Sequence, residues 1–275
     1  MKTKSKTITS SSHSPVSICP NGKSFPLPQE KDYAAEFKRL ERIVAAERKK
    51  GREIVVVMGV GFVGAVMAGV VADSADRKTG KPGKFVIGMQ RPSPRSFWKI
   101  PLFNRGISPV KAEDPEGAPL IERCVTKKKT LTATYTYDAL KLADALVVDV
   151  QNVYDEFGYG IVDPVAIHDF LAYAYTYWVS PAPSYVVLLG DGNYDPKNYL
   201  KFNGTSFIPP YLMDIDPWIG ETAADNRYVT ISGMDIMPDM SLGRLPVNSP
   251  AEADVMVQKI INYESSLPAG IWRQQ

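Results

Sequence analysis

A short apolar run followed at once by a glycine motif constrains the fold more than any other part of this 275-residue chain. Ile54 to Met58 is unbroken apolar sequence of largely β-branched character, typical of a strand buried on both faces of a parallel sheet. A helical pattern that includes Ala65, Val66 and Val70 follows. The six residues in between have the spacing Gly-X-Gly-X-X-Gly: Gly59, Val60, Gly61, Phe62, Val63 and Gly64. Strand, glycine turn and helix in this order predict the start of a βαβ unit.

The three glycines of this motif have separate expected roles in binding a dinucleotide. Gly59 permits the tight turn, Gly61 lets a pyrophosphate approach the backbone, and Gly64 lets the helix pack closely on the strand. The free N–H groups and the positive dipole end of the helix then face the phosphates. The motif therefore predicts an NAD site formed by all six of its residues. A glycine-rich turn without a ligand is the alternative.

The part of this site that should bind the ribose departs from the usual pattern. A dinucleotide site usually has an acidic residue about 20 positions further on, at the end of the second strand. The second predicted strand runs from Phe85 to Met89 and is followed by Gln90 and Arg91. Gln90 could hydrogen-bond a ribose hydroxyl, and Arg91 could face a 2′-phosphate. Both are included in the predicted cofactor site, and the choice between NAD and NADP stays open.

Alternating strands and helices continue along the chain and predict an α/β protein. Up to residue 151 we expect further helices at 31–50, 112–127 and 138–143, and further strands at 131–134 and 145–150. From residue 152 onwards we expect helices at 164–178 and 250–263, and strands at 185–189 and 227–232. Residues 193–227 are rich in Pro, Asn, Asp and Gly and are predicted to form a long loop.

Charge and tyrosine content change sharply near Val150. Residues 1–151 contain 26 Lys and Arg against 15 Asp and Glu, whereas residues 152–275 contain 6 against 15. Three tyrosines precede this position and 11 follow it. Such a step predicts two domains of different origin, a dinucleotide-binding domain at 31–151 and a second domain at 152–275. The net charge of +2 is the sum of two unlike halves and indicates no partner.

The N-terminal region and the rare residue types narrow the class of protein. Residues 1–30 carry four lysines and a Ser/Thr-rich stretch, and we expect a disordered leader there. No apolar run of about 18 residues predicts a membrane span, and no apolar segment resembles a secretion signal. Cys19 and Cys124 are the only cysteines, which favours a cytoplasmic protein without disulfides. We expect neither a nucleic-acid nor a membrane partner.

The glycine motif is the first of several motifs between residues 53 and 151. In order they are Val57–Gly64, Leu102–Pro109, Glu113–Pro115, Thr130–Thr134 and Ala143–Ala145. This segment resembles the NAD-binding N-terminal domain of the UDP-glucose/GDP-mannose dehydrogenases, the nucleotide-sugar dehydrogenases. The resemblance implies a Rossmann fold that binds NAD. It also implies that the catalytic cysteine belongs to later domains, so we expect a nucleotide sugar not to bind fully.

A second series of motifs covers residues 148–275. In order they are Val153–Gly160, Val187–Gly192, Ile208–Pro210, Ala224–Asn226, Gly243–Val247 and Lys259–Glu264. This segment resembles the gingipain-type cysteine peptidases, which implies a caspase-like fold. Together the two resemblances predict a partial Rossmann-like parallel sheet followed by a partial caspase-like α/β unit. Both families have a strand like Val147–Gln151, which would make a natural joint.

Neither resemblance supplies a catalytic group within these residues. Peptidase chemistry of this type needs a thiolate nucleophile and a histidine that moves protons. Residues 152–275 contain no cysteine, and His168 lies in a predicted helix outside the family's catalytic motif. We interpret Cys124 as a core or surface thiol. We therefore predict no catalytic residue for either reaction.

The acidic residues of the second half have structural and functional interpretations. Asp225 corresponds to a region that helps form the substrate pocket in some gingipain-type peptidases, but it could equally brace a turn. Five loop aspartates could offer oxygens to calcium, namely Asp191, Asp195, Asp214, Asp216 and Asp225. They lack the tight spacing of a calcium loop, so we favour solvated carboxylates and predict no metal site.

Three functions stay open at this point. The favoured one is an NAD-binding dehydrogenase fragment joined to a peptidase fragment, without complete catalytic machinery for either reaction. The alternatives are a working module derived from a cysteine peptidase, and a nucleotide-sugar dehydrogenase completed by a partner chain. Titration with NAD(H) and a peptide-cleavage assay would separate them.

Overall fold

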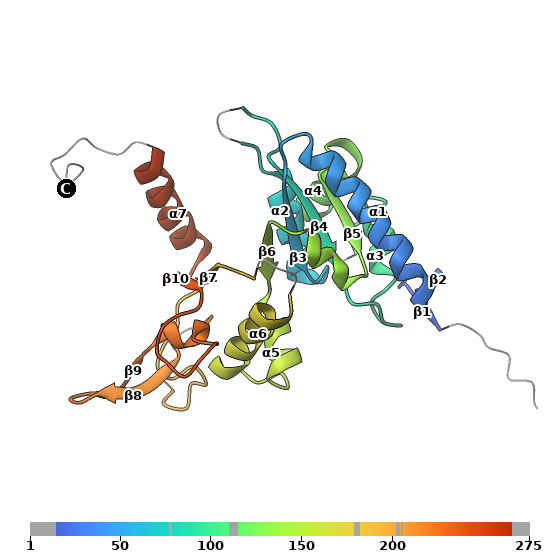
Figure 1. The fold of residues 1–275 in the computed structure, drawn as a ribbon. Coiled ribbons are helices and arrows are strands. Elements are labelled where there is room, and N and C mark those ends of the chain that lie inside the picture. The colour runs from blue at the N-terminus through green and yellow to red at the C-terminus, as the bar shows by residue number, and fades with distance from the viewer. Residues whose placement is uncertain are drawn as a thin grey trace, which may run out of the picture. The chain divides into compact units, whose positions relative to one another are not determined.

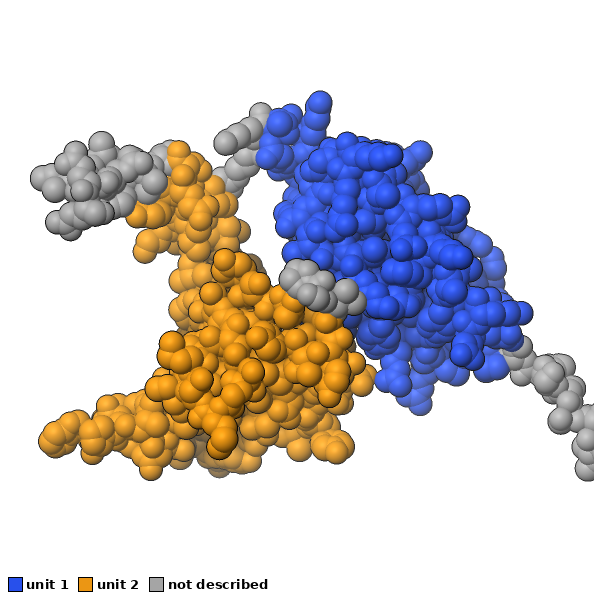
Figure 2. All heavy atoms as spheres, in the orientation of Figure 1, with its two compact units in different colours: residues 1–149 blue, residues 150–275 orange. Residues whose placement is uncertain are grey.

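The chain consists of two compact units, Met1–Asp149 and Val150–Gln275 (Figure 2). The computed structural model describes residues 15–76, 79–109, 115–178, 182–201, 204 and 206–265. Each unit has its own secondary structure and its own buried residues, and the two are described separately below.

A four-stranded parallel sheet forms the centre of the first unit (Figure 1). Its strands are β3 (Glu53–Met58), β4 (Lys84–Met89), β5 (Leu131–Thr134) and β6 (Ala145–Val148). The spatial order is β5-β4-β3-β6, so the chain runs outward from β3 to β5 and then returns to the other side of β3. This is the strand order of a Rossmann-like half-sheet. The α/β class and the Rossmann-like sheet predicted from the sequence are confirmed.

Side chains of β3 alternate between two apolar layers. Ile54 and Val56 pack toward α1 (Glu30–Arg48), whereas Val55 and Val57 pack toward α2 (Phe62–Asp73). All four β3 residues are at most 3% exposed. Each contributes about 1.5–3 kcal/mol by leaving water, which is why this strand is apolar without alternation.

Helices cover both faces of this sheet. On one face α1 lies with the 3-10 helix η2 (Tyr137–Leu142), and Leu40, Val44 and Ala139 contribute to the buried cluster. On the other face α2 packs with α3 (Lys99–Phe103), α4 (Gly117–Glu122) and the π-helix η1 (Arg123–Lys127). The helix predicted at 112–127 is observed from residue 117 to residue 127, as α4 followed directly by η1, and residues 110–114 lie outside the described part of the chain.

The predicted disordered leader is wrong for residues 16–26. β1 (Val16–Ile18) and β2 (Ser24–Pro26) form an antiparallel hairpin. Its Ser17 hydroxyl donates to the carbonyl of Pro94 and accepts from the N–H of Trp98, which ties the hairpin to the first unit. Residues 1–14 lie outside the described residues, so the leader stays a prediction there.

The second unit is a smaller α/β arrangement. Its parallel strands are β7 (Tyr185–Leu189) and β10 (Ser241–Leu245), and a separate hairpin joins β8 (Leu212–Asp216) to β9 (Gly220–Ala223). Its helices are α5 (Val150–Phe157), α6 (Pro164–Tyr177), the 3-10 helix η3 (Asp225–Val229) and α7 (Pro250–Ser265). The described part of the chain contains no helix that is both long and apolar enough to cross a membrane.

Three predictions for this region need correction. The predicted loop at 193–227 contains the β8–β9 hairpin. Where a strand was predicted at 227–232, the first three residues instead form the end of η3. The strand β10 was not predicted.

The two long helices of the second unit differ in burial. Helix α6 packs against α5 and η3 and has four buried residues, whereas no residue of α7 is buried within the described chain. On β7, every second side chain from Tyr185 to Leu189 is exposed.

Candidate functional site

The glycine loop lies where the strand order of the first unit reverses. It follows the carboxyl end of β3, which is flanked by β4 on one side and β6 on the other. From β3 the chain moves first to the β4 side and only later to the β6 side. In open α/β sheets ligands bind in the crevice at the carboxyl ends of the strands at such a switch point.

Two of the three motif glycines are required by the fold itself. Gly59 has a φ of +83°, a left-handed conformation that other residues adopt at a cost. A Cβ on Gly64 would lie 2.0 Å from the carbonyl oxygen of Gly59, so no side chain fits between α2 and the turn. These two positions match the roles predicted for them.

Gly61 is different, because nothing in the described part of the chain requires a glycine there. It is the N-cap of α2 in an extended conformation with a φ of −77°, which any residue can adopt. A Cβ at this position would meet no protein atom within 4 Å. The backbone of Gly61 therefore faces open space at a helix N-terminus. This is the place where a pyrophosphate would need a close approach to the backbone.

The first turn of α2 offers hydrogen-bond donors to such a group. No side chain among the described residues caps this helix, and its first turn contains no acidic residue. The first N–H groups of a helix have no partner within it and carry its positive dipole end. Val60 is fully buried, whereas Val63 on α2 is about half exposed. The described residues around the glycine loop therefore fit a dinucleotide pyrophosphate.

Gln90 contacts the glycine loop directly. Its side-chain Oε1 accepts a hydrogen bond of 3.1 Å from the N–H of Val60. Next to it, the N–H of Gly59 donates to the carbonyl of Met89 at 2.6 Å. The structure thus brings Gln90 from the end of β4 to the motif, and Arg91 follows it as an exposed residue. The predicted contact of Gln90 with a ribose stays a prediction.

Asp225 is paired with an arginine in the second unit. Arg244 on β10 donates two hydrogen bonds to its carboxylate, at 2.6 and 3.0 Å. The same guanidinium donates to the carbonyls of Gly190, Ile208 and Pro209. This geometry supports the bracing role among the two interpretations of Asp225, and its role in a substrate pocket stays a prediction.

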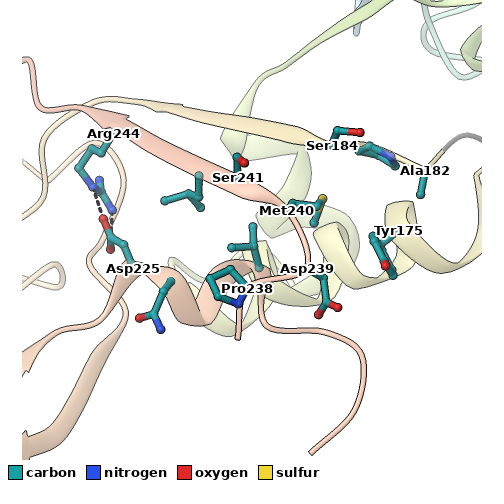
Figure 3. A pocket seen from close by; sticks show the side chains of 13 residues that line it. Tyr175, Ala182, Ser184, Asp225, Pro238, Asp239, Met240, Ser241 and Arg244 are labelled. Carbon is teal, nitrogen blue, oxygen red and sulfur yellow. Dashed lines mark hydrogen bonds and ion pairs between the residues drawn. The ribbon is translucent and has the colours of Figure 1, made fainter. Parts of the chain in front are cut away.

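A hollow of about 930 Å³ lies beside this ion pair (Figure 3). Tyr175, Asp225, Asp239 and Ser241 contribute to its lining. Asp239 accepts hydrogen bonds of 2.7 Å from two backbone N–H groups, which lower the pKa of its carboxyl group. Both carboxylates of the hollow therefore already have partners within the chain.

Residues 125–275, more than half of the chain, match the sequence model of peptidase family C25. The chain belongs to peptidase family C25. The match confirms the predicted resemblance to the gingipain-type cysteine peptidases. It begins at residue 125, inside the first unit and earlier than the predicted start at 148. The C25 segment therefore includes β5 and β6 of the parallel sheet.

Among solved structures, the chain is similar to the NDP-N-acetyl-D-galactosaminuronic acid dehydrogenase from Methanosarcina mazei Go1. The two are 16% identical with a TM-score of 0.39, over 82% of this chain and 50% of the other. This chain thus spans half the length of that enzyme. The strand order, rather than this distant likeness, supports the Rossmann-like assignment. No curated protein matches the chain.

The one histidine of the C25 segment has a local structural role. His168 lies on α6, partly exposed, with its Nε2 3.3 Å from the carbonyl of Thr230 and its Nδ1 3.1 Å from Asp169. Its ring packs edge-on against Tyr211. No cysteine occurs after residue 124, so the residues of this segment hold no thiol for it to activate.

Cys124 lies one residue before the C25 segment, and its surroundings disfavour a reactive thiolate. It is fully buried on η1, and its Sγ lies 3.6 Å from the carbonyl of Gly69 and 3.5 Å from a carboxylate oxygen of Asp73. Burial, with the Asp73 charge adding to it, raises the pKa of the Cys124 thiol to about 11. Reactive cysteines have lowered pKa values instead. The interpretation as a core thiol agrees with this geometry.

We expect Cys124 to resist alkylation in the folded chain. Its thiol stays protonated at pH 8 because the folded-state pKa of about 11 lies well above that pH. Iodoacetamide labelling followed by mass spectrometry should find Cys124 unmodified in native protein and modified after denaturation. Labelling of the native protein at the denatured rate would contradict the burial described here.

Two of the loop aspartates stabilise turns by accepting hydrogen bonds from backbone N–H groups. Asp195 accepts the N–H groups of Tyr199 and Leu200, and Asp216 accepts those of Trp218 and Ile219. Within the described part of the chain, no group of three or more His, Cys, Asp or Glu is placed to hold a metal ion.

Proposed function

We propose that this chain binds a nicotinamide dinucleotide at the glycine loop of the first unit. The observation that carries the proposal is Gly61, whose missing side chain faces open space and serves no purpose in packing. The switch point of the sheet and the uncapped N-terminus of α2 support the same place.

In this proposal each part of the loop has a distinct role. The backbone of Gly61 and the first turn of α2 bind the pyrophosphate, while Gly59 and Gly64 hold the turn in shape. Gln90 fixes the loop by accepting the N–H of Val60. Phe62 and Val63 complete the six-residue motif as the first residues of α2. The bound nicotinamide ring would supply hydride acceptance.

We further propose that these 275 residues do not complete either catalytic site. Residues 152–275 contain no cysteine, and Cys124 is buried with a raised pKa. The dehydrogenase resemblance at 53–151 and the C25 match share residues 125–151. We place the change from one family to the other within this shared segment. The segment forms the end of the proposed domain at 31–151, and the second proposed domain follows at 152–275. A nucleotide sugar would then find only part of its site.

Membership of family C25 favours peptide hydrolysis as a second candidate function. It requires a thiolate, but residues 125–275 contain no cysteine, and Cys124, one residue before this segment, is buried. A partner chain could in the same way complete the dehydrogenase.

Titration and a cleavage assay test these proposals together. We expect NADH or NADPH fluorescence to change saturably with added protein, and ADP-ribose to compete whereas adenosine does not, because the loop recognises the pyrophosphate. We expect no thiol-dependent cleavage of peptide amides. Absence of saturable binding would refute the dinucleotide site, and cleavage abolished by iodoacetamide would favour the peptidase function instead.

A further inference from the structure

The amino ends of β3, β4 and β5 form a basic edge of the first unit, at the end of the sheet away from the glycine loop. This basic edge consists of the described residues 47–53, 73–76, 79–84 and 127–131. It contains nine Lys and Arg against four Asp and Glu. Because parallel strands all begin at the same end of a sheet, these segments come together from distant parts of the chain.

Hydrogen bonds link the segments of the basic edge to one another. The guanidinium of Arg52 donates to the carbonyl of Lys129 at 3.4 Å, and the ammonium of Lys128 donates to the carbonyl of Asp73 at 2.9 Å. Neighbouring strands of a sheet lie about 4.8 Å apart, so the starts of three strands extend over about 10 Å. The positive side chains therefore belong to one continuous surface.

The four carboxylates of the basic edge already have partners within the chain. Three of them are paired with cations of the first unit, namely Glu47 with Lys50 and Arg52, Glu53 with Lys84, and Asp73 with Arg123 and Lys128. The fourth, Asp76, accepts hydrogen bonds from the N–H and the hydroxyl of Thr79. The negative charge of this edge is thus used locally.

Four lysines of the basic edge form no ion pair with the described residues. They are Lys49, Lys81, Lys127 and Lys129, and all four are exposed. Their ammonium groups keep a full positive charge in contact with water. Like charges gathered on one edge raise the local potential and attract anions from solution. These four lysines therefore offer an anion contacts that the chain itself does not use.

The surroundings of these lysines distinguish between classes of polyanionic partner. None of the large apolar side chains exposed on the described chain lies in the basic edge. A membrane-surface site needs an apolar face, and protein interfaces centre on apolar and aromatic anchors. Binding of single-stranded nucleic acid relies on aromatic side chains that stack on bases. A duplex needs none of these, because it presents one phosphate charge per about 1.7 Å of its axis.

We propose that the basic edge of the first unit binds the phosphate backbone of double-stranded nucleic acid without reading its sequence. The site is separate from the proposed dinucleotide site, since the six-residue strand β3 keeps the two about 20 Å apart. This proposal replaces the expectation of no nucleic-acid partner, because the net charge of +2 conceals a basic edge behind an acidic second unit.

Fluorescence anisotropy of a labelled DNA duplex, titrated with the full chain, tests this site. A duplex of about 20 base pairs should bind saturably, and one of unrelated sequence should bind within about twofold of it. Four phosphate contacts predict that affinity falls about a hundredfold between 50 mM and 200 mM salt. Absence of saturable binding, or binding that salt does not weaken, would overturn the proposal.

A triple variant locates the contact. Lys49→Gln, Lys127→Gln and Lys129→Asn together remove three charges of the basic edge. Lys129 has a φ of +51°, which asparagine adopts more readily than most residues, so this substitution adds no strain. We expect the affinity for the duplex to fall about tenfold or more, and the slope of its salt dependence to shrink by about three contacts.

The matched control removes the same charge elsewhere on the first unit. Lys31→Gln, Lys38→Gln and Arg95→Gln together replace three exposed cations outside the basic edge and should lower the affinity about threefold or less. Thermal unfolding verifies that both triple variants fold. An equal loss of affinity in the two variants would mean that net charge, rather than this edge, binds the duplex, and would overturn the site.

Two competitions test the ligand and the place. A single strand of the same length should bind more weakly than the duplex, and phosphatidylserine vesicles should not compete with it. Tighter binding of the single strand, or competition by the vesicles, would overturn the choice of a duplex. Saturating NADH should leave duplex binding unchanged, because the glycine loop lies at the other end of β3. Displacement of the duplex by NADH would place it at the glycine loop and overturn a separate site.

Discussion

Replacing Arg244 with methionine is expected to destabilise the second unit by about 2–3 kcal/mol, because breaking this partly buried ion pair costs somewhat less than breaking a fully buried one. The guanidinium is 15% exposed and its partner Asp225 is 24% exposed, so water replaces little of what is lost. The substitution leaves a carboxylate without its counter-charge and removes the donor from three carbonyls. Those carbonyls belong to the residue after β7 and to two residues before β8. The Arg244 side chain therefore connects both segments, and Asp225, to β10.

Hydrogen exchange read by peptide is the measurement that locates this effect. Exchange should accelerate in peptides covering β7, β10 and η3, whereas peptides from the parallel sheet of the first unit should keep their protection. Arg227→Met is the matched control, because it makes the same substitution on η3 at a residue outside the Asp225 pair and should cost about 0.5 kcal/mol or less. Unchanged protection in Arg244→Met would show that the pair does not hold the unit.

The parallel sheet of the first unit could be predicted because its strands are buried on both faces. Ile54 to Met58 and Phe85 to Met89 have no polar residue to mark an exposed side, and the observed strands differ from these ranges by one residue at most. The glycine motif fixed the position of α2 for a local reason, since a turn with a positive φ and a close helix contact both need glycine.

Elements stabilised by distant partners could not be predicted in the same way. β10 contains Gly243 and Arg244 in its interior, and a glycine beside a charged residue does not predict a strand. The strand is stabilised by pairing with β7 and by the ion pair between Arg244 and Asp225. The hairpin at residues 16–26 depends on Ser17, whose hydroxyl contacts Pro94 and Trp98 far along the chain. Local sequence carries no sign of such contacts.

In the candidate site, too, local features could be predicted from the sequence and contacts with distant residues could not. The six motif residues were predicted from their spacing between a strand and a helix, whereas the hydrogen bond through which Gln90 holds the loop at Val60 was not predicted. Arg244 was not singled out as a partner of Asp225. A signal existed, because an arginine between apolar residues in Gly243–Val247 needs a buried acceptor, yet the sequence does not say which of the loop aspartates supplies it.

Two of the three motif glycines, Gly61 and Gly64, provide the sharpest test of the function of the loop. Gly64→Ala should destabilise the first unit by about 3 kcal/mol, because its Cβ would lie 2.0 Å from a backbone oxygen that cannot move aside without distorting the turn. Gly61→Asp should leave the unfolding free energy within about 0.5 kcal/mol, since aspartate is a good N-cap and its Cβ meets nothing. The same Gly61→Asp protein should lose dinucleotide affinity by about a hundredfold or more, because its carboxylate would face the pyrophosphate.

Urea unfolding and NADPH titration of the same preparations measure both quantities. Gly61→Asn is the matched control for charge, because it has nearly the same size and capping ability and should lose less affinity than Gly61→Asp. A Gly61→Asp protein that is as stable as the parent and binds as tightly would mean that the open space beside Gly61 is not where the pyrophosphate lies. A loss of binding without a loss of stability would mean that a glycine with no role in packing is required by the ligand.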